Sequence, residues 1–411
     1  MITYMSNYKT WLLVFSLTIL TNHSLFGQIG DSLKNSNSDS MNMDAAYNRP
    51  FLSMKKMPVA LGGYLEANSY YATEDGVTDG LSFQARRLTI FMSATISERI
   101  KFLSEMEFEH GTEEIGIEFA AMDISLHPLL NLRGGIIMNP IGAFNQNHDG
   151  PKWDFIERPD VSVNMLPATW SNAGFGLFGK TRLGNWTLGY EAYLTNGFDN
   201  SIIDNPENRT FLPASKDNGL RFDENNSGKP LTTGKLAIKN RKIGEFGFSY
   251  MGGVYNKYQA DGVTLDEERR LDVIAFDWRT KIKKIGTEIT GEAVLINVDV
   301  PGTYTQQFGS QQRGVFIDVV QPVLRRKVLE WEEACLNLSA RFDYVDWNIG
   351  QFAETGEEIG DHLMAVTSGI SFRPSSQTVL RINYRYQWQT DILNNPAALK
   401  AAWLCGFSTY F

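Results

Sequence analysis

The stretch Thr378-Val379-Leu380-Arg381-Ile382-Asn383-Tyr384-Arg385-Tyr386-Gln387-Trp388 alternates between apolar and polar side chains from Leu380 onward. Leu380, Ile382, Tyr384, Tyr386 and Trp388 share one face, and Arg381, Asn383, Arg385 and Gln387 share the other. Successive side chains of a β-strand point to opposite faces. The stretch therefore predicts a strand with one apolar face and one polar face.

The same alternation returns along the chain from residue 58 to its end. Segments of this type lie at roughly 58–72, 81–96, 99–110, 115–127, 129–139, 171–182, 184–197, 231–240, 244–257, 269–280, 285–298, 311–323, 331–345, 362–373, 376–388 and 400–411. An even number of strands, with short turns on one side and long loops on the other, is typical of bacterial outer-membrane barrels. The longest connectors are 140–170, 198–230 and 346–361.

A soluble β-sandwich would also alternate, but its strands are usually about five or six residues long. Many segments here run to ten or more, which is enough for a tilted membrane crossing. Aromatic side chains near the segment ends match a girdle at the two bilayer interfaces. They are Tyr70, Tyr71, Trp186, Tyr255, Trp331, Trp347, Trp388, Trp403 and Tyr410. We therefore predict an all-β, transmembrane antiparallel β-barrel of about 16 strands.

The N-terminal residues predict export. Lys9 precedes the apolar run 11–20, which is too short to span a bilayer but matches the core of a signal peptide. Small Gly27 stands at the expected cleavage position, so 1–27 is predicted to be a cleavable signal peptide. Residues 28–57 are polar and lack periodicity, and we interpret them as a flexible N-terminal periplasmic segment. The barrel then occupies 58–411, in the outer membrane of a Gram-negative bacterium.

Composition narrows the function classes. The 411 residues carry 38 Lys+Arg and 47 Asp+Glu, a net charge of −9, whereas nucleic-acid binding needs a basic face. The two cysteines, Cys335 and Cys405, fall on opposite strand faces and are expected to be free thiols. The five histidines are not paired at metal-ligand spacing, and no nucleophile elbow or phosphate loop occurs. We predict neither an enzyme nor a cofactor or metal site.

Charged residues on the polar strand faces are the candidates for lining the lumen. The cations are Arg87, Lys101, Arg341, Arg381 and Arg385, and the anions are Glu105, Glu107, Glu109, Asp123, Glu191, Glu288 and Glu292. The row Glu105, Glu107 and Glu109 is either a cation-attracting stripe or a solvated face balanced by Arg87 and Lys101. The basic run 324–327 is either a lipopolysaccharide contact in an external loop or simply solvated. Phe411 ends an alternating strand and resembles an outer-membrane assembly signal.

Several stretches, in this order, resemble the phosphate-selective porin O/P family. They are Ala85-Arg86-Arg87-Leu88, Gly135 through Pro140 to Gly142, Phe155-Ile156-Glu157-Arg158-Pro159, Leu166-Pro167-Ala168-Thr169-Trp170 leading to Gly174 and Gly179, Tyr193-Leu194-Thr195-Asn196-Gly197, Ala340-Arg341-Phe342-Asp343-Tyr344-Val345-Asp346, and Phe372-Arg373-Pro374 through Tyr384. The resemblance implies a sixteen-stranded, trimeric channel whose long third external loop, here 140–170, folds into the pore. After Gly135 the family carries a Gln and a basic residue, whereas this chain has Ile136, Ile137 and Met138, so phosphate specificity is not expected.

Two functions follow as hypotheses. The first is an outer-membrane porin for small hydrophilic solutes or ions, embedded in lipid and lipopolysaccharide as a homotrimer. The second is a sealed barrel that serves as a structural anchor, adhesin or partner-binding surface. Arg158, the only arginine of 140–170, is expected to face the lumen. It would either pin the loop through an ion pair or bind an anionic solute group, because its planar fork suits carboxylates.

Overall fold

The computed structural model describes residues 40–50, 59–111, 113–216, 219–302 and 308–411. Among these residues no helix combines the length and apolarity that a membrane crossing needs. The predicted signal peptide and most of the predicted periplasmic segment fall outside the described part of the chain, so both remain predictions.

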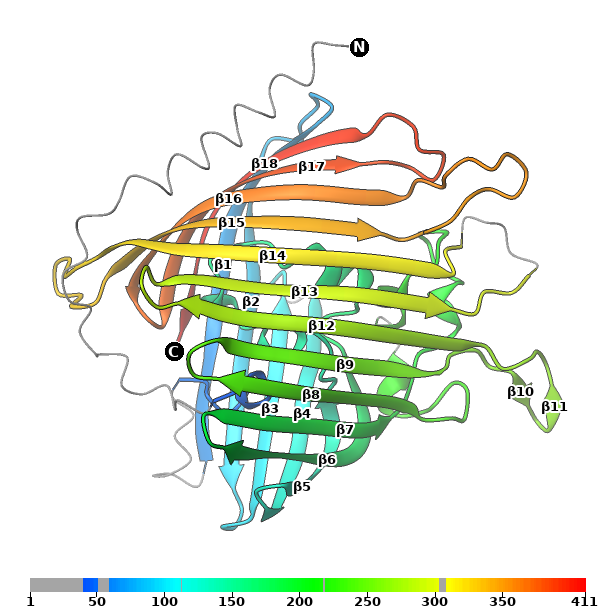
Figure 1. Cartoon of the computed structure of the whole chain (residues 1–411), viewed down its shortest axis with the longest axis horizontal. Helices are drawn as coiled ribbons and strands as arrows, with labels where there is room; N and C mark the ends of the chain where they lie inside the picture. The colour runs from blue at the N-terminus through cyan, green and yellow to red at the C-terminus, as the bar shows by residue number, and fades with distance from the viewer. Residues whose placement is uncertain (1–39, 51–58, 112, 217–218, 303–307) are drawn as a thin grey trace. The chain divides into compact units, whose positions relative to one another are not determined.

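Sixteen strands form a closed antiparallel barrel, as the alternation predicts (Figure 1). They are β1 (Val59–Glu74), β2 (Leu81–Thr95), β3 (Ile100–Glu109), β4 (Glu114–His127), β5 (Leu130–Met138), β6 (Ser171–Leu183), β7 (Trp186–Thr195), β8 (Leu231–Asn240), β9 (Gly244–Val254), β12 (Arg270–Ile282), β13 (Thr287–Val298), β14 (Gln311–Arg325), β15 (Cys335–Asp346), β16 (His362–Ser375), β17 (Thr378–Gln389) and β18 (Ala398–Tyr410). Two short strands, β10 (Gln259–Ala260) and β11 (Val263–Thr264), form a separate hairpin between β9 and β12.

The barrel closes where the first strand pairs with the last. The β1–β18 ladder runs from Tyr64 opposite Tyr410 to Glu74 opposite Lys400. The backbone of Phe411 exchanges two hydrogen bonds of 3.0 Å with Gly63, which extends this ladder to the end of the chain. Its ring lies so near Gly63 that a Cβ there would approach Phe411 Cζ to 2.6 Å. Phe411 thus lies at the closing seam, about half exposed on the outside, and its role as an assembly signal remains a prediction.

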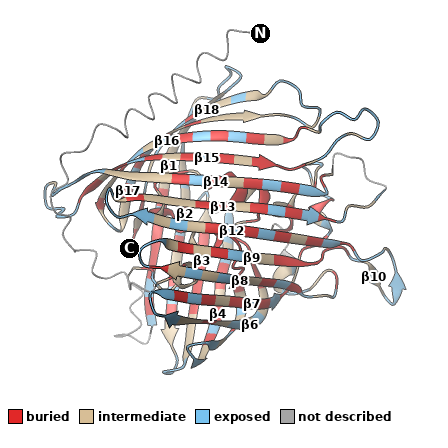
Figure 2. Cartoon of the chain, viewed as in Figure 1, coloured by how far each residue is buried: buried red, intermediate tan, exposed pale blue. Residues whose placement is uncertain are grey.

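The alternation separates outside from inside, as the bands of Figure 2 show. On β17, Leu380 and Ile382 are 47% and 50% exposed, whereas Arg381 and Asn383 are 2% and 1% exposed. Apolar side chains outside and charged side chains inside reverse the usual arrangement of a soluble protein. The reversal is stable only where lipid replaces water around the wall.

The two ends of the barrel differ in their connections. Turns such as 128–129, 184–185 and 376–377 lie at one end, which we call the short-turn end. The connections 139–170, 196–230 and 347–361 lie at the other, the long-loop end. The basic run 324–327 joins β14 to the connection before β15, which belongs to the short-turn end. The run follows the twelfth barrel strand, and short turns of bacterial barrels face the periplasm. Of the two alternatives, this position favours a simply solvated run over a lipopolysaccharide contact in an external loop.

The lumen is less polar than the sequence predicts. Near the long-loop end, buried side chains of the connections pack against apolar inward residues of the wall. The connections contribute Ile141, Val161, Met165, Trp170, Phe198, Ile202 and Leu212, and the wall contributes Met251, Val273, Val294, Ile296 and Phe316. We call this set the lumen core. Its wall residues occupy the inward positions that alternation assigns to polar side chains.

The aromatic girdle is only partly confirmed. Tyr71, Trp186, Trp331 and Trp403 are exposed on the barrel, 36% to 57%. Tyr255, Trp347 and Tyr410 are buried instead, at 2%, 3% and 8%. Tyr410 has the inward parity of β18, and its hydroxyl donates to Asp149 Oδ2 at 2.7 Å. Both cysteines are free, Cys335 buried and Cys405 exposed, as predicted.

Candidate functional site

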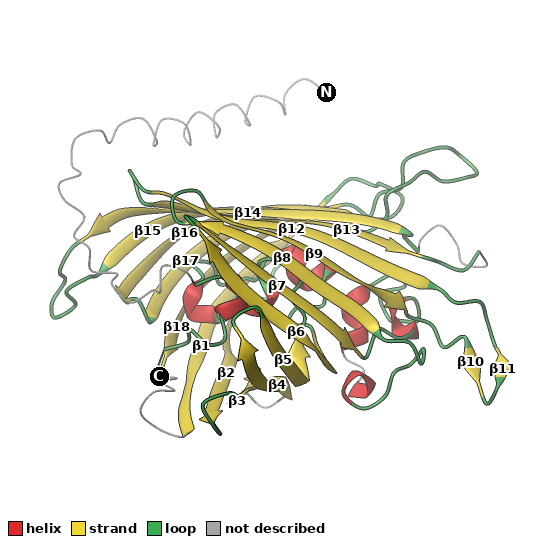
Figure 3. Ribbon diagram, turned by 60° about the horizontal axis from the view of Figure 1, so that its bottom comes forward, coloured by secondary structure: helices red, strands yellow, loops and turns green. Residues whose placement is uncertain are grey.

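The third connection at the long-loop end, residues 139–170, lies inside the barrel, and we call it the lumen loop. Figure 3 shows several short helical turns within the ring of strands. The lumen loop contains η2 (Asn145–Asn147), η3 (Gly150–Lys152) and η4 (Val161–Met165). Its backbone N–H groups donate to inward side chains of the wall. Ala143 donates to Glu292 at 2.7 Å, Ile156 to Asn383 at 2.8 Å and Asp160 to Asp343 at 3.0 Å.

Arg381 is the most completely buried of the arginines that hold this loop. Its guanidinium donates to the carbonyl oxygens of Gly150 at 3.2 Å and Phe155 at 2.7 Å. It also pairs with Glu66 on β1 at 2.7 Å, and both side chains are at most 4% exposed. Arg381 therefore connects two wall strands to the loop backbone, using the fixed fork of donors that lysine lacks.

Two further arginines, Arg341 on β15 and Arg385 on β17, also hold the loop. Arg341 forms a bidentate pair with Asp318 at 2.6 and 2.7 Å and donates to the carbonyl oxygen of Glu157 at 2.7 Å. Arg385 lies 2.5 Å from Asp160 and 3.6 Å from Asp343. Because each guanidinium has a carboxylate partner, the buried positive charges are compensated.

Asp154 connects the loop to β15 and β16. Its carboxylate accepts from Arg373 at 3.2 Å, from Asn337 at 3.0 Å and from the Ser371 hydroxyl. Burial acts to raise the pKa of Asp154, but Arg373 and these hydrogen bonds outweigh it and hold that pKa below its usual range. The carboxylate therefore remains charged at neutral pH.

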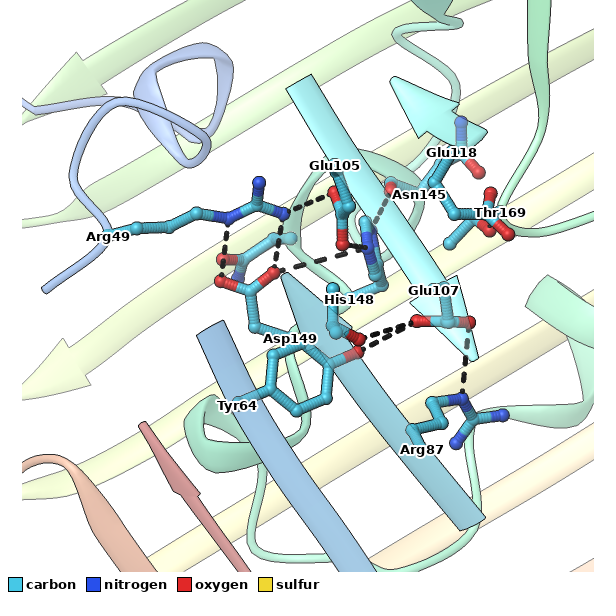
Figure 4. Close-up of polar contacts among 12 residues, drawn as sticks. Arg49, Tyr64, Arg87, Glu105, Glu107, Glu118, Asn145, His148, Asp149 and Thr169 are labelled. Carbon is cyan, nitrogen blue, oxygen red and sulfur yellow. Dashed lines mark hydrogen bonds and ion pairs between the residues drawn. The ribbon is translucent and has the colours of Figure 1, made fainter. Parts of the chain in front are cut away.

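Arg49, Glu105, His148 and Asp149 form a second cluster, which joins the lumen loop to β3 (Figure 4). Arg49 lies 2.7 Å from Glu105 and 2.8 Å from Asp149, and its guanidinium covers the Phe91 ring at 3.8 Å. His148 Nε2 lies 3.1 Å from Glu105. Burial acts to raise the pKa of Asp149, but Arg49 and Lys152 hold it well below its usual range.

Part of this cluster has the donor set of a metal site. One ligand atom from each of Glu105, His148 and Asp149 lies within 4.8 Å of the others. Arg49 donates to both carboxylates, so a guanidinium supplies the positive charge that a divalent cation would otherwise supply. The residues present fit an internal ion-pair cluster better than a metal centre.

The acidic row predicted on β3 is divided between different partners. Glu105 belongs to the Arg49 cluster, while Glu107 accepts from the hydroxyls of Tyr64 and Thr89 at 3.1 Å each. Arg87 donates to Glu109 at 2.6 Å and lies 3.5 Å from Glu107. Arg158 Nη2 lies 3.7 Å from Glu107 Oε1, so its closest described ion pair is a loose one. The row is therefore neutralised by arginines rather than left as a uniform acidic stripe.

Solvent reaches the charged side chains beside Arg158. Arg86 pairs with Glu157 at 2.9 Å, and the two side chains are 12% and 32% exposed. Burial acts to raise the pKa of Glu157, but Arg86 outweighs it and lowers that pKa. The side chains of Arg158 and Arg385 are each 10% exposed. We call Arg86, Glu157, Arg158 and Arg385 the charged patch. Glu157 is its most accessible member, and the three arginines are largely buried.

All nine predicted lining residues point inward or lie inside the barrel, but most are more buried than lining an open path requires. Arg87, Glu105, Glu107, Arg341, Arg381 and Arg385 are at most 8% exposed, and Lys101, Glu109 and Arg158 are half-buried. Sequence reasoning missed several of their partners. These are Arg49, which pairs with Glu105, and Glu66, which pairs with Arg87 and Arg381. It also missed Arg86 and Arg373, which pair with the lumen loop.

Arg86 was missed because the wall is irregular there. The β1–β2 register shifts between Glu66 and Ala67, so that Glu66 lies opposite Arg87 while Ala67 lies opposite Ala85. A β-bulge of this kind inserts one extra residue and re-aims a side chain. Arg86 therefore reaches the lumen loop although its neighbour Arg87 also points inward. The adjacent pair of arginines is the only signal that the sequence offers.

The lowered pKa values of Asp149, Asp154 and Glu157 predict how acid affects the loop. A carboxylate with a depressed folded pKa contributes stability that is complete above its unfolded value and lost as pH falls through the folded one. With unfolded values of about 3.9 for Asp and 4.3 for Glu, loop packing should be unchanged from about pH 7 to 5. It should loosen below about pH 4. Near-UV circular dichroism, which reports aromatic packing in the loop, should follow this profile, and a transition centred near pH 6 would contradict it.

Comparisons with known proteins agree with the barrel. No protein-family model matches the chain. A protein of Aquifex aeolicus (strain VF5), described only as uncharacterized, is 26% identical over 357 residues, covering 80% of this chain and 76% of that one. The anion-selective porin from Comamonas acidovorans superposes with a TM-score of 0.53 at 11% identity, over 86% of this chain and 99% of that one. OmpF of Salmonella typhi, in a complex with daunomycin, gives 0.53 at 8% identity, over 86% and 97%.

The closed sixteen-strand antiparallel barrel is therefore of the porin type. At these identities the likeness concerns the fold alone.

Proposed function

We propose that this protein is an outer-membrane porin that gives small hydrophilic solutes or ions passive passage. The observation that carries the proposal is the contrast between the two sides of the wall. Outside, large apolar side chains such as Phe175, Leu236 and Phe248 are 75%, 67% and 52% exposed. Inside, charged side chains reach solvent at the charged patch, chiefly through Glu157, and more fully near the short-turn end. There Arg279, Lys281 and Glu288 are 59%, 45% and 37% exposed.

Planar-bilayer recording of the purified protein tests this function. We expect stepwise currents, because a wetted, charged lumen conducts ions. Reversal potentials in a salt gradient then give the sign of the preferred ion. Barrels that insert, as shown by protease protection in vesicles, but carry no current would contradict the proposal.

The alternative is a sealed barrel that serves as an anchor or partner-binding surface, and the lumen core favours it. Trp170, Phe198 and Ile202 are at most 2% exposed and pack across the inside of the wall. A dry core of this kind blocks its part of the lumen. We therefore place the route of the solutes through the lumen beside the charged patch. Absence of conductance would favour the sealed alternative.

Family, partners and location are part of the proposal. The stretches quoted above support a relation to the phosphate-selective porin O/P family, a homotrimer, and contact with outer-membrane lipid and lipopolysaccharide. The charged patch contains three arginines and one carboxylate, Glu157, which already pairs with Arg86. This composition does not favour orthophosphate over other anions. Separation of unheated protein by gel electrophoresis tests the trimer, and processing of the exported chain tests cleavage near Gly27.

Replacing Arg158 with Ala should change ion selectivity or single-channel conductance while leaving the barrel folded. The Arg158 side chain is 10% exposed, and its described ion pair with Glu107 is long, at 3.7 Å, so its loss alters the local charge more than the packing. Because its pair with Glu107 is long, losing Arg158 should cost less stability than losing a closely paired buried arginine. Lys at this position should retain most of the wild-type selectivity. Wild-type currents and selectivity in the Ala variant would show that the path does not pass Arg158.

A further inference from the structure

Residues 40–50 do not behave as a free leader. They lie along the inward faces of β6 to β9 near the short-turn end. Asp44 pairs with Lys180 on β6 at 2.6 Å, and the backbone N–H of Asn42 donates to Glu245 on β9 at 2.8 Å. Met41 and Ala45 are 3% and 8% exposed. Inward side chains of the wall thus bind residues 40–50, which lie within the segment 28–57 that the sequence predicts to be flexible.

The inner face of the wall has a glycine where this segment lies close to it. Gly189 on β7 lies beneath it, and a Cβ there would approach Met43 Sδ to 2.8 Å. Further along, the hydroxyl of Tyr47 accepts from Arg133 on β5 at 3.1 Å. The segment thus contacts the barrel through apolar packing, hydrogen bonds and an ion pair at successive positions.

Arg49 extends these contacts to the lumen loop. It joins the N-terminal segment to Glu105 of the wall and to Asp149 of the loop, with all three side chains at most 1% exposed. Without this guanidinium, the two buried carboxylates would keep His148, Lys152 and the Tyr410 hydroxyl as their described neighbouring partners, and no arginine. Because an uncompensated buried charge is strongly unfavourable, the loop would shift to let water in.

We propose that residues 40–50 are an intramolecular plug on the inside of the barrel and that Arg49 is a positioning residue, which connects this plug to the lumen loop. The plug narrows the lumen from the short-turn end, opposite the lumen core. Its effect on conductance rests on the proposed channel function, but its docking does not.

Cysteine labelling measures docking independently of conductance. Ala45→Cys is placed in a full-length chain carrying Cys335→Ser and Cys405→Ser, folded into lipid vesicles or detergent. A polyethylene-glycol maleimide should react slowly with this thiol. Adding Arg49→Ala should raise the rate at least about tenfold, since breaking a buried ion pair frees the segment. Arg49→Lys should be intermediate. Arg313→Ala, at an outward arginine whose side chain is 53% exposed, should leave the rate unchanged.

Rapid labelling with Arg49 intact would overturn the plug, and slow labelling with and without Arg49 would overturn the role of Arg49. In planar bilayers, Arg49→Ala should give larger or noisier currents than the wild type, and currents identical to wild type would overturn the link between plug and loop. A silent wild-type protein that shows the labelling pattern would contradict the channel function and leave the plug supported.

Discussion

Replacing Arg381 with Ala is expected to lower the free energy of unfolding by about 3–5 kcal/mol, the range for breaking a buried ion pair. Glu66 would remain buried without its 2.7 Å partner. The carbonyl oxygens of Gly150 and Phe155 would lose a charged donor at the same time. Urea unfolding in detergent, followed by tryptophan fluorescence, measures the loss.

Arg279→Ala is the matched control for Arg381. Arg279 also points inward and pairs with a carboxylate, Glu288, at 3.5 Å, but its side chain is 59% exposed. Solvated pairs contribute about 0–1 kcal/mol, so this variant should unfold almost as the wild type does. Arg381→Lys should recover only part of the loss, because an ammonium cannot reach Glu66 and both carbonyl oxygens in the same geometry. Equal destabilisation of the Arg279 and Arg381 variants would mean that burial does not distinguish these sites.

Trp170→Ala is expected to cost about 3–5 kcal/mol as well, here through a cavity and lost apolar burial. Trp170 is 0% exposed and stacks on Phe198 with ring centroids 4.9 Å apart and planes 8° apart. This contact joins the end of the lumen loop to the connection 196–230. Its loss should therefore also loosen both connections and raise the single-channel current.

Trp403→Ala provides the comparison for Trp170. Trp403 is 57% exposed on the outside of β18 and contacts Tyr384 at 4.8 Å between ring centroids. Its removal leaves no internal cavity, so unfolding should change much less and conductance should not change. If the two variants were equally stable, the lumen core would not contribute to holding the connections in place.

All sixteen barrel strands could be predicted because outward apolar and inward polar side chains alternate along the strands. On β15, Leu338 and Phe342 face outward, 40% and 37% exposed, while Arg341 and Asp343 are 2% and 0% exposed. Such a period of two is a local property that needs no knowledge of neighbouring strands. Strand order also followed, because antiparallel neighbours joined by short turns pair in sequence.

The partners of the inward charges could not be predicted. Arg381 on β17 and Glu66 on β1 are far apart in sequence. They meet only because β1 closes the barrel against β18, which is also the neighbour of β17. Arg86 reaches Glu157 through a register shift that alternation cannot reveal. Arg49 lies in a polar stretch that the sequence predicts to be a flexible leader. No local pattern indicates that it pairs with Glu105 and Asp149, which are distant in sequence.

The sequence alone determined the number and approximate position of the strands, because the alternation of lipid-facing and lumen-facing side chains is a local property of a strand. The apolar inward residues of the lumen core depart from that alternation. Sequence reasoning also named nine charged side chains that point inward or lie inside the barrel, and their role in lining a path remains a prediction. Only the tertiary structure decided which of those charges remain wet. Closure brings strands from both ends of the chain around one narrow interior. The lumen loop, the connection 196–230 and residues 40–50 pack together in that interior. Burial and ion pairing in that interior depend on which side chains converge, and convergence is a property of the closed barrel rather than of any one strand.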